Sequence, residues 1–257
     1  MLNNFIIKLD MTKLSVNLNK IALLRNSRGR DYPNVVEFAK KFIELGVDGI
    51  TIHPRQDERH ITQSDAIALG KLLEDNNDIE LNIEGYPSDD FLSLVESIKP
   101  DQCTLVPDAP DQLTSDHGWN LKQEMAFVKS SVARLNKVTL KNQQRLRVAI
   151  FMDPDLSQVK LVPETCSDRI ELYTEAFAES FATPTSGDVL NKYRAAARQA
   201  QELGIEVNAG HDLDLTNLSQ FLTIDNILEV SIGHALTIEC IEQGMEKVIK
   251  QYLKCCK

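Results

Sequence analysis

Residues 49–85 read GITIHPRQDERHITQSDAIALGKLLEDNNDIELNIEG, and this stretch decides the fold. A short β-rich run ends in polar residues, a run of helix formers follows, and a second β-rich run closes the stretch. Such alternation is typical of parallel sheets built from βαβ units. The stretch therefore predicts two parallel strands joined by a helix.

The same unit recurs along the chain. We expect strands at residues 14–19, 49–54, 79–85, 102–107, 146–154, 169–175, 206–211 and 228–234. We expect helices at residues 34–45, 64–73, 89–98, 121–136, 187–203, 215–222 and 235–253, and a short helix after the fifth strand. Eight units predict a closed (β/α)8 TIM barrel that forms one domain over residues 1–257, because an open doubly wound sheet usually has about six strands and a Gly-rich first turn.

The composition excludes several classes of protein. Lys and Arg total 28 and Asp and Glu total 38, which gives a net charge of −10 and argues against a nucleic-acid partner. No apolar run approaches the roughly 20 residues that a membrane-spanning helix needs, and the first residues lack a basic segment typical of secretion signals. The five cysteines are an odd number without framework spacing, so we expect reduced thiols in the cytoplasm.

Polar side chains end most of the predicted strands, where the active site of such a barrel lies. Four of the five histidines fall at these ends or in the loops directly after them. The strand-end residues of interest are Asn17, Asn19, Lys20, His53, Arg55, His60, Glu84, Thr104, Asp108, Thr114, Glu171, Tyr173, Glu175, Asn208, His211, Asp212, Gly233 and His234.

Three of these residues are suited to proton transfer. Glu84 is the last polar residue of its strand, and a carboxyl group in a partly dry site can have the raised pKa that a general acid or base needs. His53 and Arg55 alternate with apolar neighbours and share one face of the chain, so an ordinary buried histidine is the weaker interpretation. His211 follows a glycine, as His234 does. For His60, a loop histidine packed on a helix start is an equally good interpretation.

Two regions are suited to binding anions. The turn at Gly233 and His234 opens the last predicted helix, and a helix N-terminus after strand eight is the usual phosphate site of this fold. Lys20, Arg25 and Arg28 form a basic stretch after the first strand, although a solvated basic helix start has the same pattern. Together, the residues predict proton transfer on phosphorylated small molecules.

Two other functions fit parts of this pattern. His53, His60, His211, His234 and Glu84 could converge as metal ligands of a hydrolase, but an arginine beside His53 would repel the cation, so we expect no metal. A barrel that only binds phosphometabolites is the other alternative, and the intact set of acid/base side chains argues against it. The chain has no P-loop, no CxxC pair and no Ser/His/Asp order typical of hydrolases.

Seven strings carry a resemblance to a known family. They are SVNLNKIALLRNSRG (15–29), DGITIHPRQDERHI (48–61), LNIEG (81–85), LVPDAP (105–110), IELYTE (170–175), VNAGHDL (207–213) and SIGHA (231–235). In this order and spacing the chain resembles the pyridoxine 5′-phosphate synthases of deoxyxylulose-dependent vitamin B6 synthesis. The resemblance runs from about Met11 to the C-terminus, so residues 1–10 are expected to be an extension without a counterpart.

The resemblance implies a barrel with extra helices, assembled as a homo-octamer. It implies condensation of 3-amino-2-oxopropyl phosphate with 1-deoxy-D-xylulose 5-phosphate, without a cofactor. His53, Glu84 and His211 would be the acid/base residues. The implied contacts are Asn17, Arg28, Asp212, Gly233 and His234 for the aminoketone phosphate, and Asn19, Lys20, Arg55, His60 and Thr114 for the deoxyxylulose phosphate.

The chain departs from the commonest pattern of this family at three places. That pattern has Asp-His where this chain has Asn19-Lys20, and Gly where it has Asp212. It has His and Gly in strand six, where Tyr173 and Glu175 stand. Lys20 can still hold an anion, and the backbone N–H of Asp212 can still face a phosphate.

Overall fold

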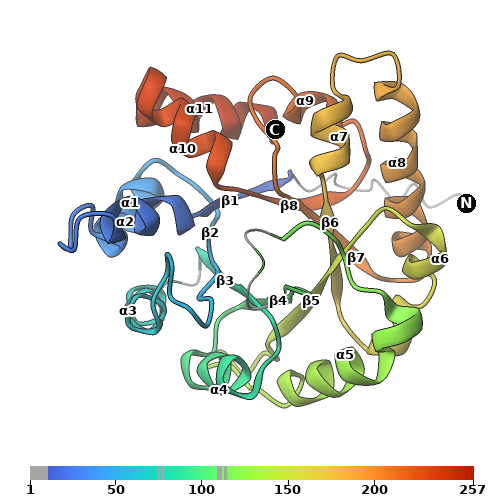
Figure 1. The fold of residues 1–257 in the computed structure, drawn as a ribbon, viewed down its shortest axis with the longest axis horizontal. Helices are drawn as coiled ribbons and strands as arrows, with labels where there is room; N and C mark the ends of the chain where they lie inside the picture. The colour runs from blue at the N-terminus through green and yellow to red at the C-terminus, as the bar shows by residue number, and fades with distance from the viewer. Residues whose placement is uncertain (1–10, 75, 77, 109–111, 113–114) are drawn as a thin grey trace, which may run out of the picture.

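The computed structural model describes residues 11–74, 76, 78–108, 112 and 115–257. Eight parallel strands form a closed barrel in chain order, and β1 pairs with both β2 and β8 (Figure 1). The strands are β1 (Lys13–Asn17), β2 (Gly49–Ile52), β3 (Glu80–Gly85), β4 (Gln102–Leu105), β5 (Arg147–Met152), β6 (Arg169–Tyr173), β7 (Glu206–Gly210) and β8 (Ile227–Ile232). The predicted (β/α)8 barrel is confirmed.

Helices surround the barrel (Figure 1). They are α1 (Asn19–Asn26), α2 (Val35–Glu44), α3 (Gln63–Leu73), α4 (Asp89–Ile98), α5 (Leu121–Leu135), α6 (Leu156–Val159), α7 (Glu175–Ser180), α8 (Ser186–Glu202), α9 (Leu218–Phe221), α10 (His234–Gln243) and α11 (Met245–Cys255), with a 3-10 turn, η1, at Val162–Thr165. Side-chain caps fix some starts. Thr62 and Asp65 form a capping box on α3, and Ser88 accepts a hydrogen bond from the backbone N–H of Phe91 on α4.

The structure corrects three of the predicted elements. The single helix expected at 235–253 is two helices, because Gly244 has a φ of 91°, which ends α10 and redirects the chain. Residues 19–26 form α1, so the first strand ends at Asn17 and not at Asn19. Likewise, Glu175 begins α7 and does not belong to the sixth strand.

The outer face of the barrel holds the main hydrophobic core. In β1 and β2, Leu14, Val16, Ile50 and Ile52 alternate with polar residues and are fully buried. They belong to one cluster that also contains the inner faces of the surrounding helices. This alternation is the source of the β-rich signal in the sequence.

The inner face of the barrel is polar. Arg169 on β6 donates a hydrogen bond to Gln102 on β4 at 2.9 Å, and these strands are not neighbours, so the bond crosses the interior. The hydroxyl oxygens of Ser15 and Thr51 lie 2.7 Å apart. Buried polar residues on the barrel strands include Asn82, Thr104, Glu171, Asn208, Glu229 and Ser231. Barrel interiors of this fold are usually filled with branched apolar side chains. In this chain, ionisable side chains such as Glu171 and Glu229 occupy the interior below the strand ends.

The last structural feature concerns membranes. None of the helices in the described part of the chain is long and apolar enough to span a bilayer.

Candidate active site

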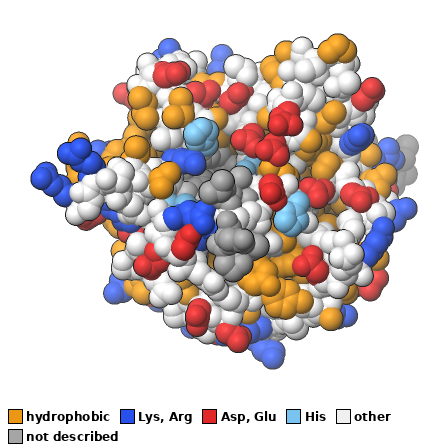
Figure 2. Space-filling view, in the orientation of Figure 1, with side chains coloured by type: hydrophobic (Ala, Val, Ile, Leu, Met, Phe, Trp, Pro, Cys, Tyr) orange, Lys and Arg blue, Asp and Glu red, His pale blue; other side chains and the backbone are white. Residues whose placement is uncertain are grey.

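An open cavity of about 330 Å³ lies at the C-terminal ends of the strands. It is lined by Asn17, Asn19, Lys20, His53, Arg55, His60, Glu84, Asp108, Ser115, Glu171, His211, Asp212, Leu213, Ser231, Ile232, Gly233, His234 and Ala235. Figure 2 shows histidine, cationic and carboxylate side chains gathered near the centre of one face. Of the acid/base and substrate-contact residues implied by the family resemblance, all except Arg28 and Thr114 line this cavity, and Thr114 lies outside the described residues.

Glu84 is the carboxyl group among the three predicted acid/base residues. It is the next-to-last residue of β3 and is buried, and it pairs in register with Thr104 of β4. Burial is the main cause that raises its pKa well above the usual range, and the nearby Glu171, Asp108 and Glu229 act in the same direction. The raised pKa favours the protonated form of the Glu84 carboxyl group, which suits this side chain to proton donation.

His53 lies at the end of β2 and is also buried. Burial lowers its pKa well below the ordinary value, and the neighbouring His60, Arg55, His211 and Arg59 lower it further. The imidazole of His53 is therefore neutral near pH 7 and can accept a proton. Its backbone N–H donates to Asn19 Oδ1 at 3.0 Å, which fixes the strand end.

His60 faces the same cavity from the loop after β2, and its ring centroid lies 6.0 Å from that of His53. Burial lowers its pKa to about 4, with Arg55 as the next cause. The Nδ1 atom of His60 accepts a hydrogen bond from the backbone N–H of Ile61 at 2.9 Å. The neutral ring therefore carries its proton on Nε2, which is free to act as a donor.

His211 follows β7 and packs against two aromatic rings, which also contact each other. Its ring centroid lies 5.2 Å from that of Tyr173 and 5.7 Å from that of Phe151. Burial lowers its pKa, and the carboxylates of Asp212, Asp108 and Glu175 oppose this effect. Gly210 precedes it for a steric reason, because a Cβ atom there would collide with the carboxylate of Glu171. The small residue therefore makes room for the Glu171 side chain.

Two carboxylates in the cavity have no role in the sequence analysis. Glu171 on β6 is buried, and burial together with Glu229 raises its pKa to about 8. Asp108 follows β4 and is also buried. Both stand at predicted strand ends, so their position was visible in the sequence, whereas their burial was not.

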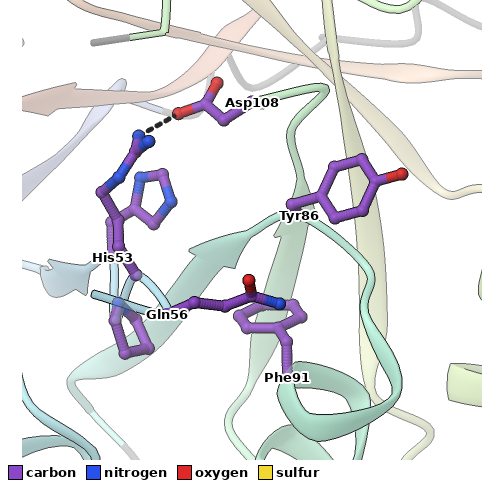
Figure 3. A pocket seen from close by; sticks show the side chains of 7 residues that line it. His53, Gln56, Tyr86, Phe91 and Asp108 are labelled. Atoms are coloured by element: carbon purple, nitrogen blue, oxygen red, sulfur yellow. Dashed lines mark hydrogen bonds and ion pairs between the residues drawn. The ribbon is translucent and has the colours of Figure 1, made fainter. Parts of the chain in front are cut away.

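Arg55 is already engaged by the protein. Its Nη1 donates to Asp108 Oδ2 at 2.8 Å and its Nη2 donates to the backbone oxygen of Gln112 at 2.6 Å. Ser115 donates to the same Asp108 oxygen at 2.8 Å. Figure 3 shows this ion pair beside His53, where a narrow pocket of about 40 Å³ extends toward Tyr86 and Phe91. Arg55 therefore adds fixed positive charge to the wall between the two pockets.

The predicted basic stretch after β1 is divided. Lys20 lines the cavity. Arg25 instead forms an ion pair with Asp65 at 2.5 and 2.7 Å, which joins α1 to α3. Arg28 is exposed beyond the end of α1 and is not among the residues that line the cavity. Thr114 lies outside the described residues.

The described side chains give no support to a metal site. Among residues 11–74, 76, 78–108, 112 and 115–257, no group of three or more His, Cys, Asp or Glu residues is arranged to hold a metal ion. The histidines line the cavity separately, and the cationic side chains of Lys20 and Arg55 line it as well.

The fold and the site define a class of protein, namely a (β/α)8-barrel enzyme with proton-transfer groups and cations in one open mouth. Within this class, the family described as "Pyridoxal phosphate biosynthesis protein PdxJ" matches residues 14–257. The chain belongs to this family. The family resemblance in the sequence motifs is thus confirmed.

Curated relatives agree over nearly the whole chain. A "Pyridoxine 5′-phosphate synthase" of Christiangramia forsetii is 48% identical over 248 residues, which cover 96% of this chain and all of the relative. The Bacteroides fragilis protein of the same name is 44% identical over 95% of this chain and 99% of its own length. The Agrobacterium fabrum protein, also of that name, is 44% identical over 95% of this chain and 97% of its own length.

Solved structures agree on the fold. The tryptophan synthase α-subunit of Pyrococcus furiosus superposes with a TM-score of 0.62 at 12% identity, covering 95% of this chain and 98% of that one. Phosphoribosyl anthranilate isomerase from Thermus thermophilus gives a TM-score of 0.56 at 12% identity, covering 95% and 98%. At such low identity the likeness concerns the architecture alone.

Proposed function

We propose that the chain is a pyridoxine 5′-phosphate synthase, which condenses 3-amino-2-oxopropyl phosphate with 1-deoxy-D-xylulose 5-phosphate. The products are pyridoxine 5′-phosphate, inorganic phosphate and water. The observation that carries the proposal is the meeting of one carboxyl group with a raised pKa, Glu84, and two imidazoles with lowered pKa values, His53 and His211, in one cavity beside cationic side chains. The shared name of the curated relatives supports the same reaction.

The chemistry needs proton transfer more than any other form of catalysis. The amine of the aminoketone can itself attack the ketose carbonyl and lose water to form a Schiff base, so neither a catalytic lysine nor a cofactor is required. Enolisation, dehydration, loss of phosphate and ring closure remain. Each of these steps moves a proton between carbon, oxygen or nitrogen and a side chain.

The separated pKa values suggest how the roles divide. Glu84 would donate a proton to a leaving oxygen, because burial and neighbouring carboxylates favour its protonated form. His53 starts neutral and would accept a proton from carbon, because burial and nearby cations disfavour the imidazolium form. His211, whose charge is favoured by three carboxylates, would act as the second base and return its proton later.

Two phosphate groups need two anion sites. For the aminoketone phosphate we propose Asn17, Asp212, Gly233 and His234, where the N-terminus of α10 opens into the cavity. For the deoxyxylulose phosphate we propose Asn19, Lys20, Arg55, His60 and Thr114, with the Nε2 proton of His60 as a donor. Arg55 would have to exchange or share its partner Asp108 to bind a phosphate.

Arg28 completes the first set and points to assembly. It does not line the cavity of its own described chain, and we propose that a second copy supplies it. Leu23 and Leu24 on α1 and Ile238 and Ile241 on α10 are 44%, 48%, 43% and 68% exposed, and these two helices contact each other. Exposed apolar side chains on adjoining helices favour an interface. This face would suit an interface of the homo-octamer that the family resemblance implies, and we propose that assembly, with the protein in the cytoplasm. Light scattering on the wild type and on Ile241→Asp tests the assembly.

A two-substrate assay tests the function. Purified protein is incubated with both phosphorylated substrates, and pyridoxine 5′-phosphate is measured by its absorbance and mass. We expect product only when both substrates are present, and an unchanged rate in EDTA. Phosphate release that EDTA abolishes, without ring formation, would indicate a metal-dependent hydrolase. Binding of both esters without any product would indicate a non-catalytic barrel.

A further inference from the structure

The loop after β7 has an unusual backbone at two consecutive residues. His211 has a φ of 72° and Asp212 a φ of 40°, although neither is glycine. Left-handed conformations of such residues cost about 1 kcal/mol or more each and persist only where the surrounding structure imposes them. They are also concentrated at functional sites, so this pair calls for an explanation.

The surrounding structure does impose the conformation. The Thr174 hydroxyl donates to the backbone oxygens of Gly210 and His211, and the Asn217 amide donates to the backbone oxygen of Asp212 at 3.1 Å. The backbone N–H of Leu213 donates to the oxygen of His211 at 2.5 Å. Three neighbouring groups thus hold the turn from both sides.

The consequence is a change in which way the side chains point. In an extended strand, consecutive side chains point to opposite faces, so His211 and Asp212 would be separated. The left-handed turn breaks this alternation, and both side chains line the same cavity. Nδ1 of His211 and Oδ2 of Asp212 lie 4.0 Å apart. Within the described chain, the Asp212 carboxylate accepts no hydrogen bond, so it is available to the imidazole.

We propose that Asp212 is a positioning residue for His211: its carboxylate keeps the Nδ1 proton on its own side, leaves Nε2 facing the cavity as the proton acceptor, and stabilises the imidazolium that results. The proposal rests on the role proposed above for His211. At 4.0 Å the carboxylate lies beyond hydrogen-bond distance of Nδ1, so it acts through its charge. A negative charge on the Nδ1 side of the ring favours the proton there and makes Nε2 a stronger general base.

Other charged groups also face this imidazole, and they set the background. Asp108 from the loop after β4 and Glu175 from α7 favour the protonated form, while Lys20 from α1 opposes it. His53 from β2 is close enough to interact electrostatically. The rings of Tyr173 and Phe151 contact the imidazole, whose side chain remains 31% exposed. Of these groups, Asp212 is the one that belongs to the same left-handed turn as His211. The backbone of the turn therefore fixes the position of its carboxylate relative to the imidazole.

The test measures the titration of His211 without any substrate. The rate at which diethyl pyrocarbonate modifies each histidine is followed by peptide mass spectrometry between pH 5 and 8 in the intact, assembled protein. Only the neutral imidazole reacts, so the midpoint of the rate profile gives the pKa of His211. The variant is Asp212→Asn, because asparagine tolerates a left-handed backbone and lacks the charge. Glu179→Gln, on the exposed side of α7, removes one charge elsewhere.

We expect the His211 midpoint to fall by about 0.5–1 pH unit in Asp212→Asn, as a unit charge at about 4 Å predicts. The midpoint should stay in place in Glu179→Gln, and that of the exposed His117 should stay in place in both. An unchanged His211 midpoint in Asp212→Asn, or an equal shift in Glu179→Gln, would overturn the proposal. A lack of synthase activity would instead refute the proposed function and leave this measurement intact.

Discussion

The side-chain oxygen of Asn19 accepts a hydrogen bond from the backbone N–H of His53 at 3.0 Å. The side-chain oxygen of Asn17 in turn accepts a hydrogen bond from the backbone N–H of Asn19 at 3.0 Å. The end of β1 therefore holds the start of α1, and the start of α1 holds the end of β2. Two residues that the sequence predicts as substrate contacts also position an acid/base residue.

This relationship predicts different effects for two substitutions of Asn19. Asn19→Ala leaves the His53 N–H without its acceptor, so we expect a loss of about 1 kcal/mol in the free energy of unfolding and a lower kcat. Asn19→Asp keeps an acceptor oxygen and should retain the stability. Thermal unfolding and steady-state kinetics measure both effects. Equal stability of the Ala and Asp variants would show that the bond does not matter.

The buried carboxyl group of Glu171 predicts a pH-dependent stability. Its pKa of about 8 lies above the ordinary value of 4.5, so the native state binds a proton that the unfolded state releases as the pH rises from about 4.5 to 8. The wild type therefore loses stability over this range relative to Glu171→Gln. We expect the variant to gain about 1–4 kcal/mol relative to the wild type between pH 5 and pH 8.

Chemical denaturation at both pH values measures this gain, with the exposed Glu44→Gln as the control. The control should differ from the wild type by the same small amount at both pH values. A Glu171→Gln variant with no such pH dependence would mean that Glu171 ionises normally in the folded protein.

Truncation of Arg25 should affect stability, whereas truncation of Lys20 should affect substrate binding. Arg25→Ala removes the ion pair that joins α1 to α3, in which both side chains are about nine-tenths buried, so we expect a loss of about 1–3 kcal/mol in stability and a near-normal KM. Lys20→Ala should leave stability nearly unchanged and raise the KM of a phosphorylated substrate. Unfolding curves and KM values decide the matter, with the exposed Arg30→Ala as the control. An Arg25→Ala variant with normal stability and a raised KM would show that Arg25 binds a substrate phosphate.

A side chain at Gly85 should overlap the ring of Phe91, and a smaller residue at position 91 should relieve this overlap. A Cβ atom at this position would overlap the ring of Phe91, so Gly85→Ala should destabilise the protein by about 1–3 kcal/mol and displace the adjoining Glu84. Replacing the ring in Gly85→Ala/Phe91→Leu should recover part of the loss. Thermal unfolding of the two single variants and the double variant measures the coupling. Strictly additive losses would show that the overlap relaxes elsewhere.

Much of this fold could be predicted because it depends on local patterns. The alternation of apolar and polar residues in each strand reports the two faces of the barrel, and the polar residue at each strand end reports the mouth. His53, Glu84, His211 and Gly233 could be grouped for this reason alone. The topology of the barrel then brings them together without further information.

The rest depends on contacts between distant segments or on the backbone. The pairing of Arg25 with Asp65 joins residues on different helices, so a basic stretch could be mistaken for an anion site. The break at Gly244 interrupts a helical pattern whose apolar periodicity continues on both sides. Aspartate and histidine tolerate a left-handed backbone better than most residues, but the turn at His211 and Asp212 is fixed by hydrogen bonds from Thr174 and Asn217, which lie at a distance in the sequence or in the following loop.

The rate of pyridoxine 5′-phosphate formation by Glu84→Gln tests the central claim most directly. Glutamine has the shape of the protonated carboxyl group but cannot release or take up a proton, so the variant should fold and bind both phosphate esters. We predict that its turnover falls by at least about 100-fold, the usual contribution of a positioned general acid, while substrate affinity by calorimetry changes little. A turnover near that of the wild type, in a variant that binds both esters, would contradict the assignment of Glu84 and the mechanism built on it.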